Sequence, residues 1–148
     1  MTRHLKIFLI PVLLGFGQIT MSRYQADDIT GIWFTPENQS KVKIYKKNGK
    51  YYGKLVWVEK THDKNGKLLT DVKNPDEKLR NRPYTGMEFM YHFEFNGNDK
   101  WENGKIYNAQ DGRTYSAYLQ LIDKNTLKVR GYIGVEWIGG NSIWKRAG

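Results

Sequence analysis

The stretch "GKIYNAQDGRTYSAYLQL", residues 104–121, decides the fold of this chain. An Asp-Gly pair, Asp111 and Gly112, separates two segments in which residue types alternate. Asp-Gly suits a tight turn, because glycine tolerates a positive φ and the aspartate side chain hydrogen-bonds its own backbone. The stretch therefore predicts two antiparallel strands joined by a hairpin. The alternative is an active site in which Asp111 acts with Tyr107 and Tyr115, but only the turn also explains Gly112.

The same turn signals recur along the chain. Asn48-Gly49, Asn96-Gly97, Lys124-Asn125 and Gly139-Gly140 each lie beside segments rich in β-branched and aromatic residues. Such segments are typical of strands, and no stretch has a sustained helical period. Eight strands are predicted, near residues 29–35, 41–47, 50–59, 86–95, 100–107, 113–122, 126–134 and 141–146. We expect an all-β, antiparallel up-and-down barrel rather than a sandwich, because closure removes the sheet edges.

A segment between the third and fourth predicted strands, residues 61–86, interrupts this rhythm. It contains "DVKNPDEKLRNRPYTG", in which Asn74 is a candidate helix N-cap and Pro75 a candidate first helical residue. Arg82-Pro83 then ends the element, since the residue before proline avoids the helical region. The segment predicts one short helix in a crossover loop. Loops of this length in a compact domain are often functional.

The first residues predict export. Arg3 and Lys6 form a short basic region, and "IFLIPVLLGFG", residues 7–17, is an apolar run too short to span a bilayer. This is the layout of a secretory signal peptide, which we place at residues 1–26. The chain is then expected to be periplasmic or secreted, with one domain at residues 27–148.

Cleavage of the signal peptide is predicted after Ala26, although Tyr24 stands where a small residue is preferred. A retained anchor is the alternative. The chain has no cysteine, which excludes disulfides, thiolate metal sites and a lipid-modified cysteine anchor. Without residues 1–26 the chain keeps 21 basic and 15 acidic residues, a net charge of +6.

Aromatic side chains dominate the predicted interior of the barrel. Alternation places the rings of Trp57, Tyr91 and Tyr115 inside, and Tyr107 faces Tyr115 across the hairpin. An eight-stranded barrel is either filled by its side chains or holds one small ligand. We expect a nearly filled barrel, with any pocket small, near one mouth and bordered by these four residues. The alternative is that the rings only form the core.

Polar side chains gather in the crossover. Asp71, Arg80 and Arg82 are candidates for ligand binding, because two arginines beside a mouth could hold a carboxylate or phosphate group bidentately. The alternative is a capped helix whose arginines pair with acids. A third feature is a hairpin rich in lysine, at positions Lys41, Lys43, Lys46, Lys47, Lys50 and Lys54. It predicts contact with an anionic envelope surface or, alternatively, a solvated outer face.

No signature for metal, cofactor or nucleophilic chemistry is present. Only His62 and His92 follow the predicted leader, and neither has a second histidine at ligand spacing. Ser116 has no histidine placed to activate it. There is no phosphate-binding loop or dinucleotide fingerprint. We predict no catalytic residue, no metal and no cofactor, and export makes nucleic acid an unexpected partner.

Two short motifs near the ends of the domain resemble those of a known barrel class. "GIW" (Gly31, Trp33) and "WKR" (Trp144, Arg146) are similar to the lipocalin arrangement, in which a basic side chain from the end of the barrel covers the tryptophan of a Gly-x-Trp. We therefore expect Arg146 to cover Trp33. Because the first and eighth strands run in opposite directions, this contact requires a short or bent first strand, or an Arg146 that reaches back along its own strand.

From residue 28 to the C-terminus the chain resembles an uncharacterised bacterial exported family, the domain of unknown function 2147. The pieces that carry the resemblance are "DDITGIW", "YYGKLVWV", "DVKNPDEKLRNRPYTG", "WENGKIYNAQDGRTYSAYLQL" and "LKVRGYIG". The resemblance implies a lipocalin-like barrel behind a signal peptide and supplies no activity.

Three functions fit these features. The first is a non-enzymatic barrel that binds a small, partly apolar ligand or an envelope partner. The second is an isomerase or hydrolase that uses tyrosine and carboxylate groups at the mouth. The third is a structural envelope protein with a filled barrel. A cavity would favour the first, and converging acid, tyrosine and arginine groups with perturbed pKa values would favour the second.

Overall fold

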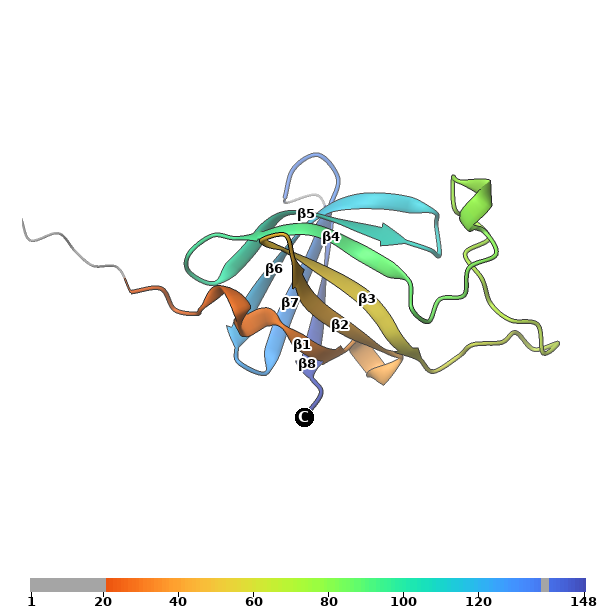
Figure 1. Ribbon diagram of the computed structural model, residues 1–148, viewed down its shortest axis with the longest axis horizontal. Coiled ribbons are helices and arrows are strands. Elements are labelled where there is room, and N and C mark those ends of the chain that lie inside the picture. Colours follow the sequence, from red (N-terminus) through yellow and green to blue (C-terminus); the bar gives the residue numbers. More distant parts are fainter. Residues whose placement is uncertain (1–20, 137–138) are drawn as a thin grey trace, which may run out of the picture.

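The computed structural model describes residues 21–136 and 139–148, and they form a closed antiparallel barrel of eight strands (Figure 1). The strands are β1 (Gly31–Phe34), β2 (Ser40–Lys47), β3 (Lys50–Val58), β4 (Glu88–Phe95), β5 (Lys100–Asn108), β6 (Arg113–Asp123), β7 (Thr126–Tyr132) and β8 (Gly139–Arg146). Each strand pairs with the next, and β8 pairs with β1. The predicted up-and-down barrel is confirmed. Most of the predicted signal peptide, residues 1–20, lies outside the described residues.

Three short 3-10 turns accompany the strands: η1 (Ala26–Ile29), η2 (Pro36–Asn38) and η3 (Glu77–Leu79). The helix predicted in the crossover is only η3, and it begins later than expected. Its cap is Asp76, whose side chain accepts a hydrogen bond from the Lys78 amide at 3.0 Å. Asn74 is buried: its side-chain amide donates to Asp71, and its Oδ1 accepts the Asp76 backbone N–H at 2.8 Å, which forms a turn just before η3.

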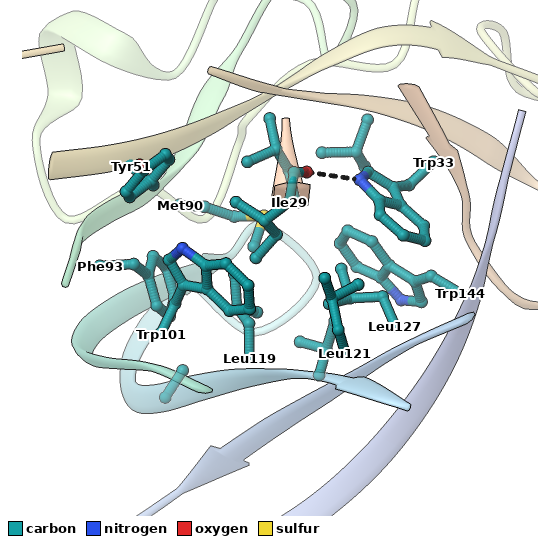
Figure 2. Packing of buried hydrophobic residues seen from close by; sticks show 14 of the residues in the cluster. Ile29, Trp33, Tyr51, Met90, Phe93, Trp101, Leu119, Leu121, Leu127 and Trp144 are labelled. Atoms are coloured by element: carbon teal, nitrogen blue, oxygen red, sulfur yellow. Dashed lines mark hydrogen bonds between the residues drawn. The ribbon is translucent and has the colours of Figure 1, made fainter. Parts of the chain in front are cut away.

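One end of the barrel is closed by the N-terminal segment. η1 lies across this end, and the Ile29 carbonyl accepts a hydrogen bond from the Trp33 indole N–H at 2.9 Å (Figure 2). The indole N–H of Trp101 donates to the Ala26 carbonyl at 3.0 Å. These bonds satisfy the polar atoms of two fully buried tryptophans, which lets both rings form the floor of the barrel.

Arg146 completes this floor. Its guanidinium lies 4.2 Å from the centre of the Trp33 ring and donates to the carbonyls of Asp28, Thr30 and Lys124. The predicted contact with Trp33 is therefore confirmed. β1 has only four residues, and Trp33 is the direct cross-strand partner of Arg146, so the short first strand is what allows them to meet.

Large apolar side chains fill the half of the barrel above this floor. Figure 2 shows the Trp33 and Trp144 rings facing each other, with Trp101 beside Phe93. The buried cluster also contains Val42, Ile44, Tyr51, Met90, Ala117, Leu119, Leu121, Leu127 and Val129. Ala117, Leu119 and Leu121, at every second position of β6, are completely buried, as the inward face of a strand requires.

Two irregularities change which side chains face inward. Val42 pairs with Leu55 while Lys41 pairs with Trp57, so β3 has one extra residue at this step. Beyond such a bulge the inward and outward positions exchange, and Trp57 is 41% exposed on the outer face.

On β4 the irregularity is at His92, which has a φ of 63°. Met90 and Phe93 are both buried in the core, three positions apart rather than two. Tyr91 therefore lies on the face opposite Met90, with its hydroxyl donating to the Glu88 carbonyl at 2.6 Å. Trp57 and Tyr91 were predicted to point inward, and both predictions are wrong, because simple alternation ignores bulges.

Candidate ligand-binding site

A cavity of about 930 Å³ lies at the end of the barrel opposite Arg146. Its walls come from β3 to β8, and its rim from the β1–β2 connection, the crossover and the β5–β6 and β7–β8 turns. In Figure 1 the crossover and the β5–β6 turn project on the side away from η1. The volume is near the upper limit for ligand-binding sites in proteins, about 300–1,000 Å³. The expectation of a nearly filled barrel with a small pocket is therefore wrong.

The walls of the cavity are mainly apolar. Leu55, Met87, Phe89, Ile106, Val129 and Trp144 all contribute. The single polar atom of Trp144, its indole N–H, donates to Ser142 Oγ at 2.9 Å, so the ring adds only apolar surface to the cavity. Gly131 on β7 leaves room, because a Cβ atom placed there would meet only the Tyr115 Cβ, at 4.0 Å.

The rim of the cavity is polar. The exposed side chains of Gln39, Glu59, Lys60, Gln110 and Asn141 border the mouth. A molecule that enters would meet hydrogen-bonding and charged groups at the opening and apolar side chains below. This gradient fits an amphiphile whose polar end stays at the mouth.

A buried carboxylate lies beside the cavity. Asp71 is fully buried and accepts hydrogen bonds from the Tyr107 hydroxyl at 2.5 Å and the Asn74 amide at 2.7 Å. The Arg82 guanidinium donates through Nε at 2.9 Å and forms an ion pair with the same oxygen at 2.9 Å. All three donors act on a charge that is removed from water, which makes each bond stronger than it would be at the surface.

Asp71 and Tyr107 each keep one protonation state near neutral pH. Burial alone raises the pKa of Asp71, but the hydrogen bonds from Tyr107, Asn74 and Arg82 and the charge of Arg82 lower it by more, so the pKa lies below its ordinary value. Burial and the bond to Asp71 raise the pKa of Tyr107 to about 12. The acid stays ionised and the tyrosine neutral, so neither is poised for proton transfer near pH 7.

These contacts attach the crossover to the β5–β6 hairpin. Tyr107 is on β5, and Lys73 Nζ donates to the Gln110 carbonyl at 2.6 Å. Gly112 lies against the crossover so closely that a Cβ atom there would be 2.1 Å from the Lys73 carbonyl oxygen. Since Tyr107 lines the cavity, the buried Asp71 network holds part of the cavity wall in place.

Tyr107 and Tyr115 are the two predicted site residues that line the cavity. They do not face each other as expected, because Tyr115 pairs with Ile106 and Tyr107 with Thr114. The hydroxyl of Tyr115 donates to Asp111, whose other oxygen accepts the Arg113 amide at 2.9 Å. With Gly112 at a φ of 71°, Asp111 is the turn former that the opening stretch predicted.

The remaining predicted site residues lie elsewhere. Trp57 and Tyr91 are on other faces of their strands, as described above. Asp71 and Arg82 bind each other behind Tyr107. Arg80 donates to the Asn74 carbonyl at 2.8 Å and lies 3.6 Å from a carboxylate oxygen of Glu77. The two arginines thus have partners within the crossover.

Sequence reasoning missed several residues of the cavity, among them Met87 and Ile106. Ile106 could have been found, because it follows the charged Lys105 in a predicted strand and so falls on the apolar side of the alternation. Met87 belongs to the end of the crossover, where no alternating pattern indicates whether a side chain points into the barrel.

The outer surface of β2 and β3 has a different character. Lys43 is the direct cross-strand partner of Lys54, and neither lies within ion-pair distance of an acid in the part of the chain that the structure describes. Lys41 lies 5.7 Å from the centre of the Trp57 ring, and Lys54 lies 5.5 Å from that of Tyr45. These five residues are called the basic face below. Two facing like charges destabilise a sheet unless an anion lies between them.

Among residues 21–136 and 139–148, no three histidine or acidic side chains come together as a metal site would require. Within the same residues, no helix is long and apolar enough to cross a membrane.

Comparison with known proteins gives one family and one solved structure. The family described as "Uncharacterized protein conserved in bacteria (DUF2147)" matches residues 31–146. Protein HP1028 from Helicobacter pylori, described as belonging to the lipocalin family, is 29% identical and superposes with a TM-score of 0.68. The match covers 80% of this chain and 82% of that one. No curated protein matches the sequence.

Proposed function

The chain belongs to the DUF2147 family of uncharacterized bacterial proteins, and we propose that it binds a small amphiphilic ligand in the cavity of a lipocalin-like barrel. The observation that supports this most is the cavity itself, about 930 Å³ with apolar walls and a polar rim. A barrel whose only task was structural would be expected to fill this space with side chains.

The apolar walls set the chemistry of the ligand. Burying a methylene group contributes about 0.8 kcal/mol, so a chain of about eight methylenes contributes about 6 kcal/mol before the cost of association. Glu59 and Lys60 at the rim carry opposite charges, so a neutral or zwitterionic polar end fits this mouth better than a highly charged one. A medium-length alkyl or acyl chain with a small polar head meets both requirements.

The test is a titration with N-phenyl-1-naphthylamine, a neutral apolar dye that fluoresces when it leaves water. Wild-type protein should bind it at one site. Gly131→Phe places a ring in the space above Tyr115 and should weaken binding at least tenfold. Ile143→Phe adds the same ring on the outside of β8, where Ile143 is 45% exposed, and should bind as wild type does. Equal affinities in all three proteins would contradict the proposal.

The proposal includes export to the periplasm or the medium. It is supported by the basic residues Arg3 and Lys6 and by the apolar run that follows them. Fractionation of cells that express the full chain should recover the folded protein outside the cytoplasm.

A second proposal concerns the basic face, which we propose binds an anionic lipid surface. Lys43 and Lys54 face each other without an acid, and Trp57 is 41% exposed beside Lys41. Tryptophan with lysine is the combination found at membrane interfaces. Each lysine near an anionic surface contributes about 1 kcal/mol, so three give roughly a hundredfold in affinity.

This second proposal is tested by co-sedimentation with phosphatidylglycerol vesicles, with phosphatidylcholine vesicles as the uncharged comparison. Replacing Lys41, Lys43 and Lys54 by Gln should abolish binding to the anionic vesicles. The control replaces three exposed lysines of the crossover, Lys64, Lys67 and Lys78, and removes the same net charge. If both triple variants lose the same affinity, only net charge matters and the basic face is not the site.

A further inference from the structure

We infer that the exported chain is cleaved between Ser22 and Arg23, so that Arg23 to Ala26 belong to the folded domain and not to the leader. This rests on the export proposed above. It differs from cleavage after Ala26, the position expected from the sequence, and the reason lies in what these four residues contact.

Tyr24 is part of the closed end of the barrel. It is 7% exposed and is a member of the buried core cluster. Its backbone N–H donates to the Asn98 carbonyl at 3.0 Å, and its hydroxyl donates to the Ile122 carbonyl at 3.2 Å. Tyr24 thus joins the β4–β5 turn to the end of β6, and its loss would open the core at that end.

The two residues after Tyr24 support the floor. The Ala26 carbonyl accepts the indole N–H of the fully buried Trp101 at 3.0 Å. The Gln25 backbone N–H donates to the Asp28 carboxylate at 2.9 Å, at the start of η1. Cleavage after Ala26 would remove both groups and leave the Trp101 N–H buried without an acceptor. An unsatisfied buried donor destabilises a fold.

A chain end at Arg23, in contrast, fits the structure. The Arg23 backbone nitrogen is in an exposed position and lies 3.1 Å from Asn98 Oδ1, a contact that a terminal ammonium group makes equally well. The Arg23 guanidinium donates to the Ile122 carbonyl at 3.1 Å and lies 5.4 Å from the centre of the Tyr24 ring. The new terminus would therefore be solvated while its side chain covers Tyr24.

The sequence also suits this position. A signal peptide ends in small residues one and three positions before the cut. Cleavage after Ser22 places Ser22 and Thr20 there, whereas cleavage after Ala26 places Tyr24 at the third position. Met21, the residue between the two small ones, is 89% exposed, and Ser22 is outside the buried core. Processing at this point removes no buried side chain, and of the contacts to Tyr24 it removes the bond from Ser22 Oγ to the Tyr24 carbonyl.

The experiment is to express the full chain from Met1, with an affinity tag after Gly148, in a Gram-negative host. N-terminal sequencing and intact mass then identify the first residue of the periplasmic protein. We expect Arg23. Asp27 or any other new first residue overturns the cleavage position but leaves export standing. A chain that keeps Met1 in the cytoplasm overturns both.

Two variants test the same point independently of the final fold, because cleavage by the signal peptidase depends on the residues beside the cut. Ser22→Leu places a large residue directly before the inferred cut and should reduce the processed fraction at least tenfold, with precursor accumulating. Met21→Leu is the matched control, with the same new side chain at the tolerant position between the two small residues, and should be processed normally. Unchanged processing of Ser22→Leu, with Asp27 as the first residue, would overturn the inference.

Discussion

Arg146 covers Trp33 from the neighbouring strand: its guanidinium lies 4.2 Å from the ring centre, and the two residues are direct partners where β8 closes the barrel against β1. The same guanidinium donates to the carbonyls of Asp28 and Thr30, so one side chain holds the ring and the N-terminal segment together. With this end closed, a ligand can enter only at the mouth where the cavity lies.

Replacing Arg146 by Met should lower the free energy of unfolding by about 3 kcal/mol, because a cation–π contact and charge-assisted hydrogen bonds are lost together. Lys124→Met is the control, since the Lys124 side chain is exposed on the turn below and only its carbonyl contacts Arg146. Urea unfolding followed by tryptophan fluorescence measures both. Equal stabilities of the two variants would show that Arg146 does not hold this end.

Replacing Tyr107 by Phe should destabilise the protein by about 1–2 kcal/mol, because a buried carboxylate loses a donor at 2.5 Å. Tyr115→Phe removes the hydroxyl that donates to Asp111, but this pair is on the surface. The loss of stability in Tyr115→Phe should therefore be smaller than that in Tyr107→Phe, because solvent weakens an exposed bond. Thermal unfolding of the two variants gives the comparison, and a larger effect at Tyr115 would contradict the structural role assigned to Asp71.

The acid stability of the fold should depend on Asp71. Because the pKa of Asp71 is lower in the folded protein than in the unfolded chain, its ionised form contributes stability above the ordinary value near 3.8. That contribution is lost as the pH falls through the folded pKa. Asp71→Asn should be less stable than wild type at pH 7, and the difference should shrink as the pH falls below the ordinary value near 3.8. A pH-independent difference would mean that Asp71 does not act through its charge.

Gly112 and Gly97 provide a matched pair of turn glycines. Both have a positive φ, 71° and 84°, so an alanine at either position is strained by about 1 kcal/mol. Only at Gly112 does the added Cβ overlap the crossover backbone, 2.1 Å from the Lys73 oxygen, whereas it meets nothing at Gly97. Gly112→Ala should therefore lose about 3 kcal/mol in total. Equal losses in a denaturant titration would show that the crossover is not attached at this turn.

Much of the barrel could be predicted from the sequence because its signals are local. Asp111-Gly112 and the other turn pairs mark hairpins, and hairpins in succession leave few topologies besides a closed barrel. The contact between Trp33 and Arg146 is not local, and only a resemblance to lipocalins pointed to it. The helix expected at Asn74 is only the turn η3, capped by Asp76, although Asn74 Oδ1 does accept the backbone N–H two residues on, that of Asp76, at 2.8 Å.

Less of the candidate site than of the fold could be predicted from the sequence. Trp57 and Tyr91 were assigned inward by a strict period of two, and bulges in β3 and β4 moved both. The pairing of Arg82 with Asp71 joins residues 11 positions apart through a loop with no repeating pattern, which no periodicity predicts. The cavity depends on where side chains leave space, and a sequence does not reveal unfilled volume.

Native mass spectrometry of the protein purified from its own host tests the central claim most directly. If the cavity binds a small amphiphile, the folded protein should carry a bound mass of a few hundred daltons. Organic extraction should release that mass, Gly131→Phe should lack it, and Ile143→Phe should retain it. Wild-type protein that carries no bound mass, together with no binding of the apolar dye, would contradict the account.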